Sequence, residues 1–174
     1  MIFYHASNIE GLEELHANSR SHGEEGKRVL YLTDNRAYSL FYLRDKKINF
    51  VTCGVREDGL VHYFERFPNQ LQVIYEGQTG YLYQCNSNDK IKETKTKGVW
   101  IIEENTRIDD AEYVTDAYRE ILKAEAEGNV IIHRFADIPE EESKRMANHI
   151  KEHLEEEPQE RKEFYIKYFS SIWD

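Results

Sequence analysis

Four residues with imidazole or hydroxyl groups lie near short apolar segments in the first quarter of the chain. His5 follows the apolar run that opens the sequence, and Tyr31 lies in a second run, residues 29–32. Ser39 and Tyr42 follow in a segment whose apolar positions repeat at helical spacing. Residues three apart on a helix are neighbours, so these two side chains can face one pocket. Two strands and one helix that present a His, a Ser and two Tyr could hold a flat polar ligand.

A second pattern with possible chemistry is His149-x-x-Glu152-His153. On a helix, this spacing can place two histidines on one face to bind zinc. The other interpretation is a solvated helix, because residues 140–163 are rich in Glu, Lys and Arg. A zinc hydrolase would also need a further ligand from the short remainder of the chain. Zinc hydrolysis is therefore the minor hypothesis, and we expect no metal.

The composition limits the class of protein. The chain has 174 residues, 40% hydrophobic and 13% aromatic, which suits one globular domain with a substantial core. Its net charge of -10 disfavours nucleic-acid backbones as partners, so a protein is the favoured partner. No stretch approaches the roughly 18–20 apolar residues of a membrane span, and the N-terminus does not resemble a signal peptide. Cys53 and Cys85 have no metal-binding spacing, so we expect free thiols and a cytoplasmic location.

The order of elements predicts an α+β fold. The sequence Asp58-Gly59 is typical of a two-residue turn, so residues 48–57 and 60–67 should form a hairpin. A helix is expected from Asp34 to about Arg44, with Thr33 or Asp34 as its N-cap. Further short strands are expected at residues 2–4, 29–32, 72–75, 80–85, 98–102 and 130–135.

The last third of the chain is predicted to be largely helical. Residues 109–112 resemble a capping box that opens a helix, and Gly128 follows its last apolar residues. Pro139 should open a second helix, and Pro158 should separate it from a third over residues 161–173. We expect one domain, residues 1–174, with a core at 1–135 and a helical extension at 137–174. Two chains could pair through that extension.

The first group of residues resembles the ADP-ribosyltransferase fold, in its diphtheria-toxin and poly(ADP-ribose) polymerase branch. In that branch the first core strand carries His-Gly-Ser/Thr and the second ends in Tyr. The following helix carries a Ser and a Tyr, eight and eleven residues after the strand Tyr. The resemblance covers residues 2–45 by motif and 46–104 by strand order. The matching residues are His5-Ala6-Ser7, with Ala in place of Gly, and Tyr31, Ser39 and Tyr42.

The third motif of this family is a Glu on a later strand. Glu103 and Glu104 follow the strand expected at 98–102, at a corresponding place in the order. We favour Glu104, although the sequence does not choose between them. Neither has a Glu or Gln two residues earlier, because Ile101 and Ile102 occupy those places. This departs from the Arg-modifying branch of the superfamily.

The resemblance implies that the ligand is NAD. Its nicotinamide ring would lie between Tyr31 and Tyr42, and its carboxamide would bond Ser39 and the backbone of Ala6. One Glu would stabilise the positive charge that develops on the ribose as nicotinamide leaves. An acceptor would then attack the ribose.

The rest of the dinucleotide would lie along the first strand and the loop after it. The resemblance implies that His5 holds a ribose hydroxyl of the adenosine half. Residues 18–22 would close over the phosphates, with Arg20 as their charge partner. Two other functions stay open, namely an inactive nucleotide-binding or interaction module on the same fold, and an interaction protein that acts through residues 137–174.

Overall fold

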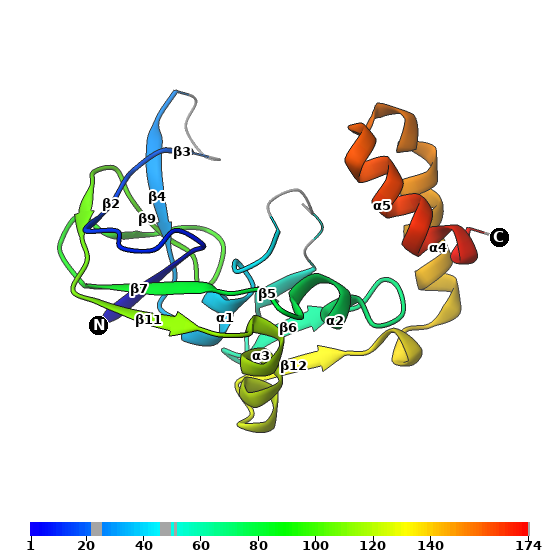
Figure 1. Cartoon of the computed structure of the whole chain (residues 1–174), viewed down its shortest axis with the longest axis horizontal. Helices are drawn as coiled ribbons and strands as arrows, with labels where there is room; N and C mark the ends of the chain where they lie inside the picture. Colours follow the sequence, from blue (N-terminus) through cyan, green and yellow to red (C-terminus); the bar gives the residue numbers. More distant parts are fainter. Residues whose placement is uncertain (22–25, 46–49, 51, 174) are drawn as a thin grey trace.

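The computed structural model describes residues 1–21, 26–45, 50 and 52–173, and it has an α+β fold built on small sheets (Figure 1). Two antiparallel sheets make up the N-terminal part. The first has the order β1–β7–β11, with strands β1 (Ile2–Ser7), β7 (Gly80–Asn86) and β11 (Asp110–Val114). The second has the order β3–β4–β9–β8, with strands β3 (Ser19–Arg20), β4 (Arg28–Leu32), β9 (Trp100–Ile102) and β8 (Lys92–Glu93).

A third sheet has the order β12–β6–β5. Its strands are β5 (Cys53–Val55), β6 (Val61–Phe64) and β12 (Val130–His133), and β12 runs parallel to β6. The hairpin predicted around Asp58-Gly59 is confirmed for β5 and β6. The two-residue turn predicted to join them is wrong, because the Gly59 N–H donates to the Arg56 C=O at 2.9 Å and Gly59, but not Asp58, has a positive φ, of 82°. Residues 48, 49 and 51 of that prediction lie outside the described part of the chain. A short pair joins β2 (Glu14–Leu15) to β10 (Thr106–Arg107).

The helices are short in the first half of the chain and longer at its end. The α-helices are α1 (Arg36–Leu40), α2 (Gln70–Tyr75), α3 (Ala117–Ala126), α4 (Glu140–Glu152) and α5 (Gln159–Phe169). Three single 3-10 turns are η1 (Phe135–Asp137), η2 (Leu154–Glu156) and η3 (Ser170–Ile172). Pro139 and Pro158 precede α4 and α5, as the sequence predicts. The last predicted helix instead ends as α5 at Phe169, and η3 follows it.

The strand predicted at residues 72–75 is wrong, because these residues belong to α2. The carboxylate of Glu65 accepts a hydrogen bond from the Leu71 backbone at 3.0 Å, which satisfies one of the free N–H groups in the first turn. Leu71, Ile74 and Tyr75 are buried at helical spacing. A tertiary contact therefore supplies the start signal that the local sequence lacks.

The helix predicted to open at residues 109–112 is also wrong at its start. Residues 110–114 form β11, which pairs along β7. The helix begins after Asp116, whose side chain accepts a hydrogen bond from the Arg119 backbone at 3.0 Å. The acidic residues thus belong to a strand, because the edge of β7 offers backbone partners that a helix at this place would leave unpaired.

The helix predicted from Asp34 to about Arg44 is shorter and has a different cap. Asn35 is the N-cap and accepts from the Tyr38 backbone at 3.0 Å. Thr33 is unavailable, because its backbone pairs with Tyr4 and its hydroxyl accepts from the Asn35 N–H. After α1, the chain continues as a tight turn, in which Tyr42 N–H donates to Ser39 C=O at 3.1 Å.

Three apolar clusters hold these elements together. The largest packs α1, α2 and α3 against one face of β1–β7–β11 and of β12–β6–β5, and includes Phe41, Tyr63 and Leu82. The second lies between β1–β7 and β4–β9. The third joins α4 and α5 to Phe67 after β6, and these two helices stand at one end of the molecule (Figure 1).

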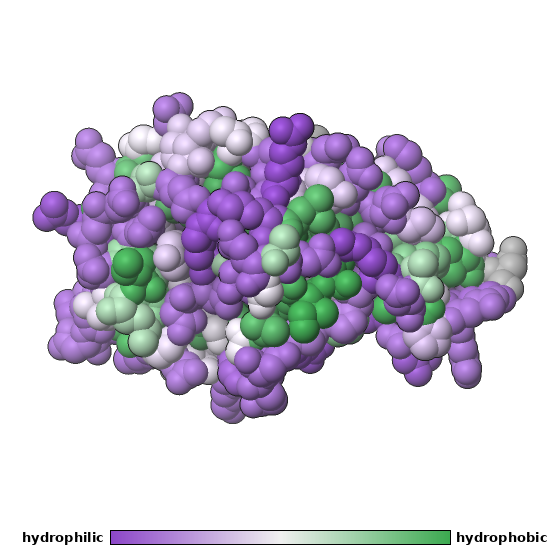
Figure 2. All heavy atoms as spheres, turned by 90° about the horizontal axis from the view of Figure 1, so that it is seen from below, coloured by the Kyte–Doolittle hydropathy of each residue, from purple (hydrophilic) through white to green (hydrophobic). Residues whose placement is uncertain are grey.

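The surface is largely polar. On the face in Figure 2, hydrophilic side chains surround apolar ones that gather near the middle. Within the described ranges, every helix is too short or too polar to cross a bilayer. Cys53 and Cys85 are both unpaired, as predicted. Burial raises the pKa of the Cys53 thiol to about 12 and that of the Cys85 thiol to about 11, so both thiols are protonated and unreactive at neutral pH.

Candidate functional site

The first two predicted strands meet at a single bridge. The Tyr4 N–H donates to Thr33 C=O at 2.7 Å, and the Thr33 N–H donates to Tyr4 C=O at 3.1 Å. Next to this bridge, Nδ1 of His5 lies 3.0 Å from the Tyr31 carbonyl oxygen. The bridge therefore brings together two predicted site residues that are 26 positions apart.

The bridge also fixes the direction of the Ala6 peptide groups. In an antiparallel pair, a residue directs both its N–H and its C=O to the same neighbouring strand, and the direction alternates along the chain. Tyr4 directs both groups to Thr33, so it lies in a non-bonded pair with Gln84 of β7. Ala6, two residues on, directs its donor and acceptor to the same edge of β1, toward β4. Ser7 ends the strand, and its hydroxyl accepts from the Ile9 backbone at 3.2 Å.

Tyr31 lies on the face of its sheet that points away from the second cluster. Leu30 and Leu32 pack into that cluster, and side chains alternate along a strand, so Tyr31 points to the other side. Its hydroxyl donates to the Arg20 carbonyl oxygen at 3.3 Å. The Arg20 side chain is exposed beside this contact. The Tyr31 side chain and the Arg20 backbone are thus in contact.

Ser39 and Tyr42 differ sharply in accessibility. Ser39 is 1% exposed, and its hydroxyl donates to the Arg36 carbonyl oxygen at 2.6 Å. Tyr42 is 46% exposed, and its hydroxyl donates to that of Tyr38 at 3.1 Å. Burial raises the pKa of both phenols, so they are neutral at physiological pH. Tyr42 therefore offers an accessible ring, whereas the Ser39 hydroxyl is inside the protein.

The two candidate glutamates lie just past the end of β9, beside the start of β4. Ile101 pairs directly with Tyr31 and with Lys92, so these three side chains share one face. Glu103 follows Ile101 by two residues and forms an ion pair with Lys92, at 3.5 Å, and with Lys27, at 3.6 Å. It therefore lies on the face that carries Tyr31.

Glu104 has a different partner. Its carboxylate lies 2.7 Å from the ammonium nitrogen of Lys90, in the loop before β8. Of the two residues, Glu103 is the one whose carboxylate pairs with Lys92, which shares a face with Tyr31.

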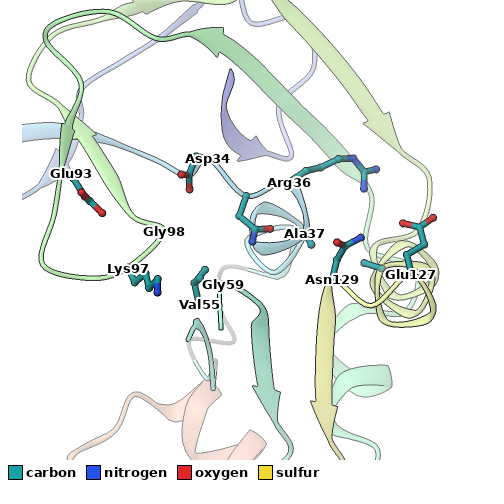
Figure 3. A pocket seen from close by; sticks show the side chains of 12 residues that line it. Asp34, Arg36, Ala37, Val55, Gly59, Glu93, Lys97, Gly98, Glu127 and Asn129 are labelled. Carbon is teal, nitrogen blue, oxygen red and sulfur yellow. The ribbon is translucent and has the colours of Figure 1, made fainter. Parts of the chain in front are cut away.

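A separate cleft of about 530 Å³ lies at the other end of β4, around the start of α1 (Figure 3). Asp34 and Lys97 lie on one side of α1, and Glu127 and Asn129 on the other. Lys97 is paired with Glu57, whereas Asp34 and Glu127 have no ion pair with any residue in the described ranges. None of the predicted site residues lines this cleft, and its unpaired acids do not suit an anionic dinucleotide.

A third group, which was not predicted, lies on the outer face of β12–β6–β5. His62 Nδ1 lies 2.9 Å from His133 Nε2, and His62 Nε2 lies 2.9 Å from an Asp58 carboxylate oxygen. The His133 ring also stacks on Phe64, with ring centres 4.2 Å apart. This chain of carboxylate and two imidazoles can relay a proton. Its one sequence signal is the spacing of Asp58 and His62 across the hairpin turn.

Burial lowers the pKa of His133, and the neighbouring His62 and Arg56 lower it further. The hydrogen bond between the imidazoles needs one nitrogen to donate and the other to accept, so the pair cannot be doubly protonated while the bond persists. The bond with His62 lowers the pKa of Asp58, so that carboxylate is charged at neutral pH. The neutral His133 is therefore the stable form in the folded protein.

The histidines of the minor zinc hypothesis lie far from these groups. His149 is in α4 and His153 directly follows it, and both are exposed. Figure 1 places α4 at the opposite end of the molecule from β1 and β4. The two candidate chemistries therefore concern separate parts of the protein.

Comparisons with known proteins identify no relative of the chain. No family model, no curated protein and no solved structure matches the chain.

Proposed function

We propose that the protein is an ADP-ribosyltransferase-like protein that binds NAD between β1, β4 and the turn after α1. The observation that carries the proposal is the meeting of His5, the Ala6 backbone and Tyr31 at the Tyr4–Thr33 bridge. These are residues that the resemblance assigns to nicotinamide and ribose. They come from separate segments, so their meeting is an independent support.

The Ala6 backbone suits a primary carboxamide. A carboxamide has an N–H donor and a C=O acceptor on one carbon, and a strand edge offers the complementary pair. The ring of Tyr31 and the exposed ring of Tyr42 supply aromatic faces for the pyridinium. Nicotinamide would thus be recognised chiefly by backbone groups and by stacking.

Glu103 is the carboxylate that we assign to the reaction, rather than the Glu104 favoured on sequence. The bond between the ribose C1′ and the nicotinamide nitrogen breaks, and nicotinamide leaves with the bonding electrons. The carboxylate stabilises the positive charge on the ribose until a nucleophile of the acceptor forms the new bond at C1′ and loses its proton. The present ion pairs of Glu103 are about half exposed, and such pairs contribute little stability, so a ligand can displace them.

The second candidate function is an NAD-binding module without turnover. Two observations favour it: lysines engage both glutamates, and the Ser39 hydroxyl is buried and already bonded. The NAD-binding residues would then act in recognition alone. An acceptor, which we expect to be a protein, would be a binding partner.

Incubation with NAD labelled in its nicotinamide and adenosine halves distinguishes these functions. Release of nicotinamide, with transfer of the adenosine label to protein, supports the transferase. A thermal shift with NAD but no release supports the binding module. If NAD causes neither nicotinamide release nor a thermal shift, both functions are overturned.

Four variants test the residue roles. We expect Tyr31→Ala and His5→Ala to abolish the thermal shift with NAD, because they remove a ring face and a ribose contact. We expect Glu103→Gln to keep the shift and lose release. Glu57→Gln is the matched control, since Glu57 also pairs with a surface lysine but lies outside the site. Unchanged release by Glu103→Gln would exclude that residue from the reaction.

A further inference from the structure

The last turn of α4 carries three potential metal ligands on one side. His149, Glu152 and His153 each offer a ligand atom, and these atoms all lie within 4.8 Å of one another. The two imidazole rings are 4.8 Å apart at an angle of 71°. In the described residues, this is the one cluster of three such side chains. We propose that it is a surface site for a divalent transition-metal ion such as Zn²⁺.

Only small side-chain rotations are needed for the three side chains to bind a metal ion. In tetrahedral coordination, with bonds of about 2.0–2.1 Å to His, ligand atoms lie about 3.3 Å apart. The three side chains are exposed, so they can close from 4.8 Å without moving the backbone. Within the described ranges, the side chains of His149 and Glu152 make no hydrogen bond or ion pair, so metal binding would change only the contact between the two imidazole rings.

The surroundings favour a cation. The site lies at the C-terminal end of a helix of 13 residues, where the helix dipole attracts positive charge. A carboxylate oxygen of Glu156 lies 3.6 Å from Nδ1 of His153. A carboxylate at one imidazole nitrogen orients the ring and leaves the other nitrogen for the metal. Imidazole and carboxylate together suit Zn²⁺, and imidazole also suits Ni²⁺ and Cu²⁺.

The site would bind an ion without catalysing hydrolysis. Its ligands come from one turn of one helix and are exposed, so no protein wall encloses the remaining coordination positions. A bound ion would link residues 149 and 153 across the end of α4, next to η2. It would therefore stiffen the helical extension. This inference is independent of NAD binding, since the two sites share no residue.

Calorimetric titration of the full chain with ZnCl₂ tests the site. We expect one Zn²⁺ per chain and a higher melting temperature with zinc. His149→Ala and His153→Ala should each lower the association constant at least about tenfold, since even loss of a supporting partner of a metal ligand costs that much. Glu152→Gln should also weaken binding, and Glu156→Gln should weaken it less than either histidine variant.

A matched control is His16→Ala, because His16 is also exposed and lies 3.5 Å from the carboxylate of Glu14. It should bind zinc as the unmodified protein does. Circular dichroism of each variant without zinc checks that α4 still forms, which these exposed positions permit. Absence of zinc binding would overturn the proposal, as would equal binding by a His149→Ala/His153→Ala double variant.

Discussion

The backbones of Tyr4 and Thr33 exchange two hydrogen bonds, of 2.7 and 3.1 Å, and this bridge joins the two N-terminal sheets. Together with the pairing of β1 along β7, it directs the Ala6 peptide groups toward the candidate nicotinamide site. A change that moves β1 should therefore affect both stability and NAD binding.

Gly80 tests how tightly the end of β1 is held. A Cβ at this position would lie 2.8 Å from the Ser7 carbonyl oxygen and 2.7 Å from a Leu43 methyl carbon. The backbone oxygen has little room to move, so we expect Gly80→Ala to cost about 1–3 kcal/mol in urea unfolding. Gly54→Ala is the control, because its Cβ would meet nothing within 4 Å. Equal stability of the two variants would contradict the packing described here.

Arg36 should stabilise α1 against its neighbours. Its guanidinium bonds the carboxylates of Glu112 in β11 and Glu120 in α3, the latter at 3.0 Å. Arg36→Met leaves these two carboxylates without their shared cation. The group is about one-third exposed and thus partly screened by solvent, so we expect a loss of about 1–2 kcal/mol. Arg119→Met should cost almost nothing, since Arg119 is 86% exposed.

The same ion pairs predict a pH dependence. Arg36 lowers the pKa of Glu112 below its ordinary value of 4.5. The stabilisation is therefore full above pH 4.5 and is lost as the pH falls through the lowered pKa. The stability difference between Arg36→Met and the unmodified protein should shrink in that acid range. A constant difference from pH 7 to pH 3 would argue against the pairing.

Substitution of Glu65 should lower the free energy of unfolding more than substitution of most other polar residues. It is 5% exposed, and its two carboxylate oxygens accept from the Leu71 and Phe135 backbones, each at 3.0 Å. Glu65→Ala leaves two N–H groups without that partner, so we expect a loss of about 2–3 kcal/mol in urea unfolding. Glu57→Ala is the control, because that side chain is 100% exposed. A loss as small as the control's would mean that water replaces the carboxylate.

His133 should make stability fall in mild acid. Its pKa is lowered below the ordinary value of 6.5, so near and below pH 6.5 the unfolded chain binds more protons at this residue than the folded chain does. Stability should therefore rise with pH through that window and level off above it. His133→Asn should flatten the rise in unfolding free energy between pH 5 and 7, whereas His16→Ala should leave it unchanged. An unaltered profile for His133→Asn would contradict the lowered pKa.

Local signals predicted the elements whose structure depends on neighbouring residues. Such cases are the apolar runs of β4, β7 and β9 and the hairpin around Asp58-Gly59, although not its exact turn, and Pro139 marked the start of α4. The predictions for residues 72–75 and 110–114 were wrong because each segment depends on a partner outside it. The carboxylate of Glu65, six residues before Leu71, bonds the first turn of α2, and the edge of the distant strand β7 pairs with β11.

The candidate site, too, has features that the sequence predicts and features that depend on strand pairing. Sequence placed His5 and Tyr31 on strands, but only strand pairing brings them together. The ion pair with Lys92, which shares a face with Tyr31, likewise depends on strand pairing and places Glu103 beside that face. The His62–His133 bond was beyond sequence reasoning, because it joins residues 71 positions apart through a parallel strand pair.

The direction of the Ala6 peptide groups has a consequence for mutagenesis. Recognition by a strand backbone does not depend on the identity of the side chain, so alanine scanning would not test this position. Proline is the informative replacement, because it deletes the N–H donor while it keeps the carbonyl.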